Sequence, residues 1–311
     1  MVEPAGVYFY IRSGVLLSGV LLGDRYKVLR KLGEGGEGEI YVARDLELRR
    51  NVAIKFQNPR AFESTQSYAS YGKFIKQEYD RLGFVKSIQG IPQVFDNGTF
   101  GRNNRQYLVM ELVDGVTFTH WISEHHPVPA EAAVSAVGQL CEILVRLHAA
   151  RYVHRDVTPN NAMVQLDGRI RLLDVGISVS TGTLNTDGGG SPGYAAPEQF
   201  DPTAKLTPQA DVFAIGALLF KMLAPQLPYS GEEHPVRSDA VPFPQGLAVE
   251  MSDSLRSLAL AMISLDPGER PSAAEVLRDL QPMLPVFDSP ASPKATCPDP
   301  TAPYRLGLSM P

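Results

Sequence analysis

Three oxygen-bearing side chains in the middle of the chain could carry out phosphate chemistry. Asp156 and Asn161 share one short segment, and Asp174 follows the strand-like residues Leu172 and Leu173. A carboxylate can accept or orient a hydroxyl proton, and carboxylate and amide oxygens are ligands that Mg²⁺ takes when it bridges phosphates. The segment therefore predicts a general base, Asp156, with two metal ligands, Asn161 and Asp174.

A glycine-rich loop near the start of the chain could approach phosphates through its backbone. Gly33, Gly35, Gly36 and Gly38 lie between two strand-like runs, so they can form a tight turn with backbone N–H groups directed at a ligand. A glycine-rich hairpin without a ligand explains the loop equally well. A dinucleotide-binding fold is disfavoured because a strand, and not a helix, follows the glycines.

Lys55 ends a strand-like run in which Ala53 faces the same side, because side chains alternate along a strand. A small residue leaves room for a flat base, and an ammonium group beside it can contact phosphate oxygens. Glu78 lies in a helical pattern at residues 71–82 and could face Lys55 as its ion-pair partner. An ordinary edge lysine and a solvated glutamate are the alternatives.

The order of these segments resembles the signature set of protein kinases: glycine-rich loop, V-A-I-K strand, H-R-D-x-x-x-x-N loop and D-x-G triplet. Downstream, residues 191–198 resemble the substrate-facing loop with its A-P-E ending, and residues 211–216 resemble the start of the central helix. Residues 266–271 resemble the closing motif of the family. The resemblance covers residues 24–285 and is nearest to bacterial serine/threonine kinases of the eukaryotic (Hanks) type.

The resemblance implies ATP and Mg²⁺ as cofactors, with Mn²⁺ as an alternative ion. Residues 33–38 would cover the phosphates, while Lys55, held by Glu78, would contact the α- and β-phosphates. Asp156 would accept or orient the proton of the substrate hydroxyl, and the two metal ligands named above would hold the ion. In the closing motif, Arg270 would pair with the A-P-E glutamate, Glu198. The adenine would be bound by Leu32, Ile40, Ala53, Met163, the gatekeeper Met110 and the backbone of Glu111 and Val113.

Short apolar runs separated by turns predict an antiparallel sheet over residues 26–113, interrupted by the single helix at 71–82. After Gly115 the patterns become helical, and they predict long helices at 131–150, 209–223, 252–265 and 272–284. The predicted fold class is α+β, the two-lobed architecture of protein kinases. Its predicted limits are 24–113 for the N-lobe, 116–285 for the C-lobe, 1–23 for an N-terminal extension and 286–311 for a proline-rich, poorly ordered tail.

Composition excludes several other classes of function. The formal net charge of −5 gives no overall attraction to nucleic acid or to an anionic membrane. Cys141 and Cys297 are too few and too far apart for a disulfide framework or a cysteine metal site, which fits the cytoplasm. The apolar run at residues 15–22 is too short to span a bilayer. We expect a protein substrate, no nucleic acid, no membrane span and at most a transient dimer between two kinases.

The chain departs from the family pattern at two positions. Thr158 stands where serine/threonine kinases usually have a lysine that reaches the γ-phosphate, and a hydroxyl cannot replace a cation. Val175 replaces the phenylalanine of D-F-G. Two alternatives therefore stay open: a pseudokinase that serves as a nucleotide-binding scaffold, and a kinase of small molecules. Tyrosine specificity is disfavoured, because Pro159 and Ser191 match the serine/threonine pattern.

Two further expectations concern regulation and docking. In relatives of this type, the arginine before the catalytic aspartate, here Arg155, pairs with a phosphate on the activation segment, residues 174–198. A phosphate on Thr181, Thr183 or Thr186 could therefore order that segment. Prolines and glycines interrupt the interval between Leu223 and Ser252, so the docking helix that relatives place there should be absent or reduced to a turn, with fewer than two helical turns over residues 229–250.

Overall fold

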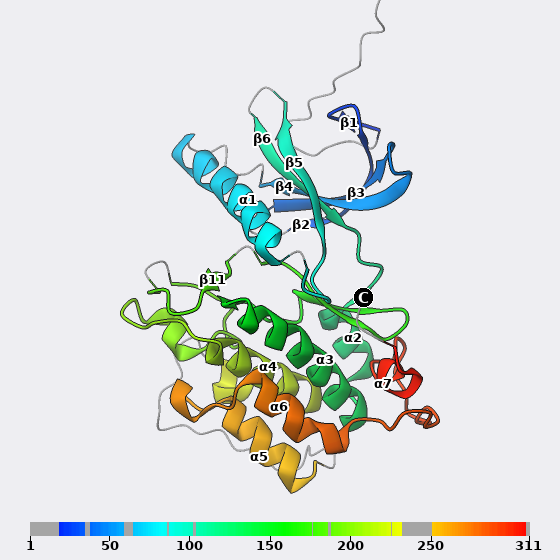
Figure 1. Ribbon diagram of the computed structural model, residues 1–311, viewed down its shortest axis with the longest axis vertical. Coiled ribbons are helices and arrows are strands. Elements are labelled where there is room, and N and C mark those ends of the chain that lie inside the picture. Colours follow the sequence, from blue (N-terminus) through cyan, green and yellow to red (C-terminus); the bar gives the residue numbers. More distant parts are fainter. Residues whose placement is uncertain are drawn as a thin grey trace, which may run out of the picture. The chain divides into compact units, whose positions relative to one another are not determined.

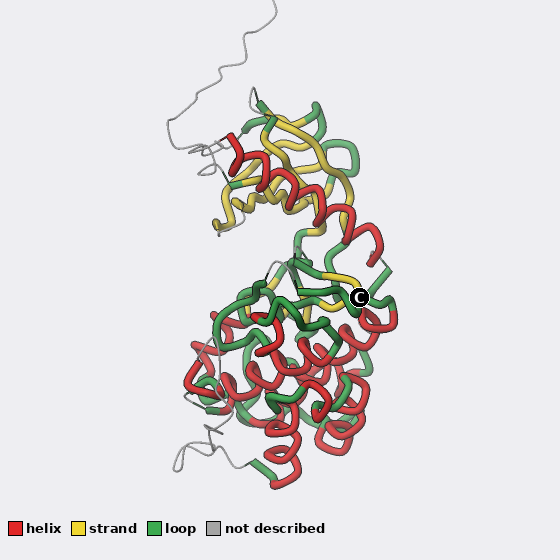
Figure 2. Tube along the Cα trace, turned by 90° about the vertical axis from the view of Figure 1, so that its left-hand side faces the viewer, coloured by secondary structure: helices red, strands yellow, loops and turns green. Residues whose placement is uncertain are grey.

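The computed structural model describes residues 19–34, 38–58, 65–85, 87–101, 104–175, 177–185, 188–224, 226–231 and 251–308. The chain forms two compact units (Figure 1), unit 1 with residues 1–83 and 93–112 and unit 2 with residues 84–92 and 113–311. Strands dominate the described part of unit 1, and helices dominate that of unit 2 (Figure 2). The predicted fold class, an antiparallel sheet with one helix followed by a mainly helical region, is confirmed.

Unit 1 is built on a six-stranded antiparallel sheet with the strand order β1-β2-β3-β4-β6-β5. One helix, α1, follows β4 in the chain and extends well beyond the predicted range 71–82. Its last two residues, with the short segment after them, belong to unit 2. The elements are β1 (Leu21–Leu22), β2 (Tyr26–Glu34), β3 (Gly38–Asp45), β4 (Arg50–Gln57), α1 (Thr65–Val85), β5 (Val94–Phe100) and β6 (Arg105–Glu111).

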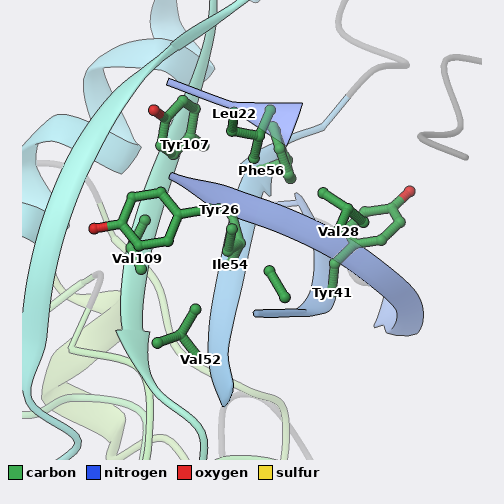
Figure 3. Close-up of a cluster of buried hydrophobic side chains, with 10 residues drawn as sticks. Leu22, Tyr26, Val28, Tyr41, Val52, Ile54, Phe56, Tyr107 and Val109 are labelled. Carbon is green, nitrogen blue, oxygen red and sulfur yellow. The ribbon is translucent and has the colours of Figure 1, made fainter. Parts of the chain in front are cut away.

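The two faces of this sheet have different roles, because side chains alternate along each strand. One face carries a buried aromatic and aliphatic cluster (Figure 3), in which Tyr41 packs edge-on against Phe56 at a ring distance of 5.7 Å. Ala53 and Lys55 alternate with the β4 members of this cluster and therefore belong to the other face. The cluster consists of Leu22, Tyr26, Val28, Tyr41, Ala43, Val52, Ile54, Phe56, Tyr107 and Val109.

Unit 2 is built around two buried helices, α3 and α4. Both match the predicted ranges closely, since each has a continuous apolar pattern of helical length. The other helices are α2 (Phe118–His125), α5 (Asp253–Met262), α6 (Ala273–Leu280) and α7 (Ala302–Leu306), while α3 is Ala130–Ala149 and α4 is Gln209–Leu223. Short strands β7 (Gly115–Thr117), β9 (Ala162–Gln165) and β10 (Ile170–Leu172) form one small sheet, and β8 (Tyr152–Val153) pairs with β11 (Val179–Ser180).

Helix α3 is long and apolar enough to cross a membrane, the one such helix among the described residues. Its most apolar window is 72% buried inside the fold. Its side chains from Ala132 to Leu144 are almost all buried against neighbouring elements of unit 2. This is the pattern of a core helix.

Serine side chains start the two predicted C-terminal helices. Ser252 accepts a hydrogen bond from the backbone N–H of Leu255, and Ser272 forms a capping box with Glu275. Helix α6 ends at Leu280, earlier than the predicted 284, and continues as the 3-10 turn Gln281–Met283 because Pro282 cannot donate the hydrogen bond of another helical turn.

The segment after Leu284 differs from the poorly ordered tail that its prolines predict. Residues 286–308 pack on unit 2, and buried side chains of two helices donate hydrogen bonds to their carbonyl groups. Trp121 Nε1 donates to Pro298 O at 2.9 Å, and Gln139 Nε2 donates to Pro300 O at 2.9 Å. Proline keeps its carbonyl oxygen as a hydrogen-bond acceptor and suits an extended backbone. Residues 286–308, called the strap below, can therefore supply the partners that these buried donors require.

We expect that ending the chain after Leu284 lowers the free energy of unfolding by about 2 kcal/mol or more, because Trp121 Nε1 loses its acceptor, Gln139 Nε2 keeps only the Gly168 carbonyl, and apolar surface becomes exposed. Thermal unfolding of the truncated and full chains measures the loss. A chain ending at Leu308 is the control and should melt with the full chain. Equal melting temperatures for all three chains would show that the strap contributes nothing to the fold.

The expected absence of a docking helix falls mostly outside the described residues. A 3-10 turn, Pro228–Gly231, is described at the start of the interval. Residues 232–250 are not among those described, so the expectation stays a prediction.

Candidate active site

Unit 1 contains a buried ion pair between a strand and its helix. Lys55 Nζ on β4 lies 2.8 Å from Glu78 Oε2 on α1, and the two side chains are 5% and 3% exposed. The predicted pairing is confirmed. Because removing one partner of a buried pair leaves the other charge unpaired at high cost, the pair fixes the position of the ammonium group on the second face of the sheet.

The residues assigned to the adenine in unit 1 share that second face. In the strand register Ile40 lies opposite Lys55, and Ala53 lies opposite Met110. Leu32, on β2, is 45% exposed. A small buried residue between larger, partly exposed apolar side chains forms a surface on which a flat base can lie.

Part of the glycine-rich loop is described. Gly33 pairs with Ile40, and a Cβ at Gly38 would lie 2.0 Å from the carbonyl oxygen of Phe56, so only glycine fits at Gly38. Gly35 and Gly36 lie outside the described residues.

The remaining residues that were assigned to the adenine belong partly to unit 1 and partly to unit 2. In unit 1, the backbone N–H of Glu111 donates to Gln93 O at 2.8 Å, so its carbonyl is the backbone group of this residue that could meet a base. In unit 2, Val113 precedes β7, and Met163 is a half-buried residue of β9 that pairs with Thr117. That each of these residues contacts the adenine stays a prediction.

The predicted base in unit 2 is held by hydrogen bonds to both of its oxygens. Asn161 Nδ2 donates to Asp156 Oδ2 at 2.6 Å and to the Asp156 carbonyl at 3.0 Å. Ser191 Oγ donates to Asp156 Oδ1 at 2.7 Å. The loop of residues 191–198, which the resemblance assigns to the substrate, is thus tied directly to the predicted base.

The same contacts orient Asn161, a predicted metal ligand. Because the amide nitrogen of Asn161 donates to Asp156, its oxygen Oδ1 is the atom that can face a cation. An amide oxygen and the carboxylate of Asp174 are the hard donors that Mg²⁺ and Mn²⁺ take, so the residues present fit the implied ion.

His154 connects the loop of the base to the strand that leads to Asp174. Its Nε2 lies 3.0 Å from the Leu173 carbonyl, and its Nδ1 lies 3.3 Å from the backbone N–H of Asp156. A carbonyl requires a donor and an N–H requires an acceptor, which assigns the neutral Nε2–H form to the ring. Arg155 and Asp174 both have left-handed backbone, with φ of 72° and 53°, a conformation that costs free energy and often occurs in catalytic loops.

Asp211 supports the same loop from helix α4, a role that the sequence alone did not reveal. It is fully buried, and its carboxylate accepts hydrogen bonds from the backbone N–H groups of His154 and Arg155, each at 2.8 Å. His148 Nε2 donates a third bond at 2.8 Å. Burial alone would raise the pKa of Asp211. The hydrogen bond and charge of His148, together with the charge and backbone hydrogen bond of His154, lower it by more, so the pKa of Asp211 lies below its usual value.

The stability that Asp211 confers should therefore depend on pH. A depressed folded-state pKa gives stability that is fully present above the unfolded carboxyl value of about 3.9 and is lost as pH falls through the folded-state pKa. Asp211→Asn should lower the free energy of unfolding by about 2 kcal/mol at neutral pH, because an amide N–H would face a backbone N–H. Urea unfolding should show that the difference in the free energy of unfolding between wild type and Asp211→Asn becomes smaller below about pH 4.

Asp279→Asn, at an exposed position on α6, is the control for this series and should match the wild type throughout. If the difference in the free energy of unfolding between wild type and Asp211→Asn stays constant down to about pH 3, it would contradict the ionised, hydrogen-bonded state of Asp211.

The predicted pair between the closing motif and the A-P-E glutamate is confirmed. Arg270 Nη1 and Nη2 donate to Glu198 Oε1 and Oε2 at 2.7 and 2.9 Å, and Arg270 Nε donates to Ser264 O at 2.6 Å. The Arg270 side chain is completely buried, and that of Glu198 is 9% exposed. The pair anchors the end of the substrate-facing loop to the helical part of unit 2.

Comparisons with known proteins agree with this geometry. The chain is 31% identical over 223 residues to the serine/threonine-protein kinase PrkC of Bacillus subtilis. The aligned residues make up 70% of this chain and 33% of PrkC. It is 30% identical over 220 residues to PknL of Mycobacterium tuberculosis, covering 70% of this chain and 53% of PknL. With PknB of Mycolicibacterium smegmatis it is 29% identical over 275 residues, covering 83% of this chain and 43% of that kinase.

The chain thus spans about a third to a half of the length of these curated relatives. A family model described as "Protein kinase domain" matches residues 26–280, which include every site residue discussed above. The chain belongs to the protein kinase family, and its relatives are bacterial serine/threonine kinases of the Hanks type.

Proposed function

We propose that this chain is a serine/threonine protein kinase that transfers the γ-phosphate of ATP to hydroxyl groups of protein substrates. The observation that carries the proposal is the Asp156 carboxylate, which Asn161 and Ser191 hold by both oxygens beside a loop that can present a substrate hydroxyl. A positioned carboxylate can orient a hydroxyl and accept its proton as the phosphoryl group moves.

Each residue that matches the family signature has a task that its surroundings support. Lys55, fixed by Glu78, would contact the α- and β-phosphates, and the backbone around Gly38 would approach the phosphates closely. Asn161 and Asp174 would hold Mg²⁺ or Mn²⁺, which when bound would neutralise charge on the phosphates. These assignments favour an active enzyme over a scaffold, since the lysine, base and metal ligands are all present.

Thr158 is the main departure from the family pattern. Its side chain is nearly buried, with the residue 4% exposed, and its carbonyl accepts from the backbone N–H of Asn161 at 3.0 Å. A lysine that reaches the γ-phosphate is therefore replaced by a small residue inside the loop. We expect slower turnover than in relatives that have the cation, because one contact to the transition state is missing.

The anchored A-P-E segment favours a protein substrate over a small molecule. Arg270 and Glu198 fix the end of the loop that would receive a polypeptide, and Ser191 lies in that loop against the base. We also propose that the chain phosphorylates itself through a transient encounter with a second copy, and that it acts in the cytoplasm, where ATP is present.

Incubation with labelled ATP, Mg²⁺ and myelin basic protein tests the proposal, with Mn²⁺ in a parallel reaction. Label should enter the protein acceptor, and ATP with Mg²⁺ should raise the melting temperature of the chain by mass action. A rise in melting temperature with no transfer to any acceptor would favour the nucleotide-binding scaffold. Transfer to small molecules but not to proteins would favour the small-molecule kinase.

A further inference from the structure

The arginine before the catalytic base is held by an uncharged side chain. Arg155 is 7% exposed, and its Nη2 donates to Asn185 Oδ1 at 3.0 Å. Asn185 lies in the activation segment, which in relatives of this type supplies a phosphate to this arginine. In this chain an amide oxygen of the segment itself accepts a hydrogen bond from the arginine.

The amide of Asn185 also holds the far end of the activation segment. Asn185 is 2% exposed, and its Nδ2 donates to the carbonyl of Gln199 and lies 3.3 Å from the carbonyls of Glu198 and Asp201. Since a guanidinium requires an acceptor and three carbonyls require a donor, only this orientation of the amide satisfies both sides. A neutral asparagine thus provides two functions that a phosphate, which has acceptors alone, cannot combine.

Gln199 completes the network from the opposite side. It is fully buried, and its Nε2 donates to the carbonyls of Arg155 and Gly189 at 2.8 and 2.9 Å. A Cβ at Gly190 would lie 2.7 Å from this amide nitrogen, and its φ is 139°, so glycine is required there. Gln199 thus binds the backbone carbonyl of Arg155, while the Arg155 side chain donates to Asn185 Oδ1 and, through Nη1, to the Ile177 carbonyl at 3.4 Å.

Backbone hydrogen bonds order the segment on which Asn185 lies. Gly182 N donates to Leu206 O at 2.7 Å, Leu206 N donates to Thr183 O at 3.0 Å, and Asn185 N donates to Ala204 O at 3.0 Å. Leu184 and Lys205 form an antiparallel bridge within this ladder. The ladder places the Asn185 amide against Arg155.

We propose that Asn185 is a positioning residue that holds Arg155, and with it the loop of Asp156, so that the activation segment is built without a phosphate. The inference rests on the proposed kinase function. It is an alternative to the expectation that a phosphate on Thr181, Thr183 or Thr186 recruits Arg155. Thr183 already donates to Ser180 O at 2.6 Å from an exposed position, and Thr186 lies outside the described residues. Self-phosphorylation at other positions is compatible with this role.

The first test uses the full chain after treatment with a serine/threonine phosphatase, with the unmodified state verified by intact-mass spectrometry. The unmodified chain should transfer phosphate to the protein acceptor without a lag, at a turnover within about twofold of the untreated chain, because its segment is already positioned. A lag that ends as phosphate enters residues 174–198 would overturn the inference while leaving the kinase function intact. No transfer before or after modification would instead contradict the proposed function.

Substitution separates positioning from general stability. Asn185→Ala should lower kcat by about tenfold or more and leave KM for ATP within about twofold, because the phosphate clamp in unit 1 is untouched. The double variant Arg155→Ala with Asn185→Ala should lose less activity than the product of the two single losses, since both single variants remove the hydrogen bond between Arg155 Nη2 and Asn185 Oδ1. Thr183→Ala, two residues away and exposed, is the matched control and should keep the wild-type rate. Wild-type kcat in Asn185→Ala would overturn the inference.

A measurement that needs no activity completes the test. Hydrogen exchange is followed on dephosphorylated Asp156→Ala protein, with and without Asn185→Ala. Backbone amides of residues 182–185 and 204–206 should be protected in the first protein and should exchange about tenfold faster in the second. Equal exchange in the two proteins, or full exposure in both, would show that Asn185 does not order the segment, whatever the enzyme's activity.

Discussion

Asp156→Ala should abolish measurable phosphoryl transfer, with a loss of about 10³-fold or more in kcat. A positioned general base contributes about 10²- to 10⁴-fold by itself, and the substitution also removes the acceptor that orients Asn161 and Ser191. The rate of label transfer from ATP to a protein acceptor measures the loss.

Two controls make the result specific to the carboxylate. Asp156→Asn keeps the size of the side chain and should be almost as inactive, since an amide cannot accept the proton. Asp279→Ala, on the exposed side of α6, should retain the wild-type rate. Both Asp156 variants should still show a rise in melting temperature with ATP and Mg²⁺, because Lys55, Asn161 and Asp174 are all still present. Substantial activity in either Asp156 variant would contradict the assignment of the base.

Arg270→Ala should have the largest effect on stability, a loss of about 3–5 kcal/mol in the free energy of unfolding. The guanidinium is completely buried, binds both oxygens of Glu198 and donates to the carbonyl of Ser264, so its removal leaves a buried carboxylate and a carbonyl without a partner. Denaturant unfolding of the variant and the wild type measures the loss.

The chain contains a matched exposed pair for comparison. Arg278 and Asp279 form an ion pair at 3.3 Å on α6, with side chains 67% and 48% exposed. Arg278→Ala should change stability by less than about 1 kcal/mol, because solvent screens an exposed pair. If Arg270→Ala proves too unstable to purify, Glu198→Gln should give a smaller loss in the same direction. Equal stability of Arg270→Ala and Arg278→Ala would mean that the A-P-E segment is not anchored as the structure indicates.

The sequence predicted the parts of the site that depend on local patterns. Strand alternation placed Ala53 and Lys55 on one face, and helical spacing placed Glu78 where it could reach them; the structure joins Lys55 and Glu78 at 2.8 Å. The pair of Arg270 and Glu198 followed from the order of the family motifs. These features could be predicted because each depends on a sequence periodicity or on a motif of fixed composition.

Other parts of the structure could not be predicted because their hydrogen-bond partners are distant in the sequence. The order of residues 286–308 depends on donors from Trp121 and Gln139, more than a hundred residues away, and proline content by itself indicates the opposite. Asp211 was read only as the start of a helix, although it holds the loop of the base. Asn185 showed no local signal, because an asparagine in a loop is ordinary and its role comes from Arg155 and the carbonyls of three distant residues.

The most direct test of the central claim is mass-spectrometric mapping of phosphate on a protein acceptor after incubation of the wild-type chain with ATP and Mg²⁺. The account predicts phosphate on serine and threonine residues of the acceptor, and none when Asp156→Ala replaces the wild type under the same conditions. An acceptor that stays unmodified while the wild-type chain binds ATP, or one modified equally by wild type and Asp156→Ala, would contradict it.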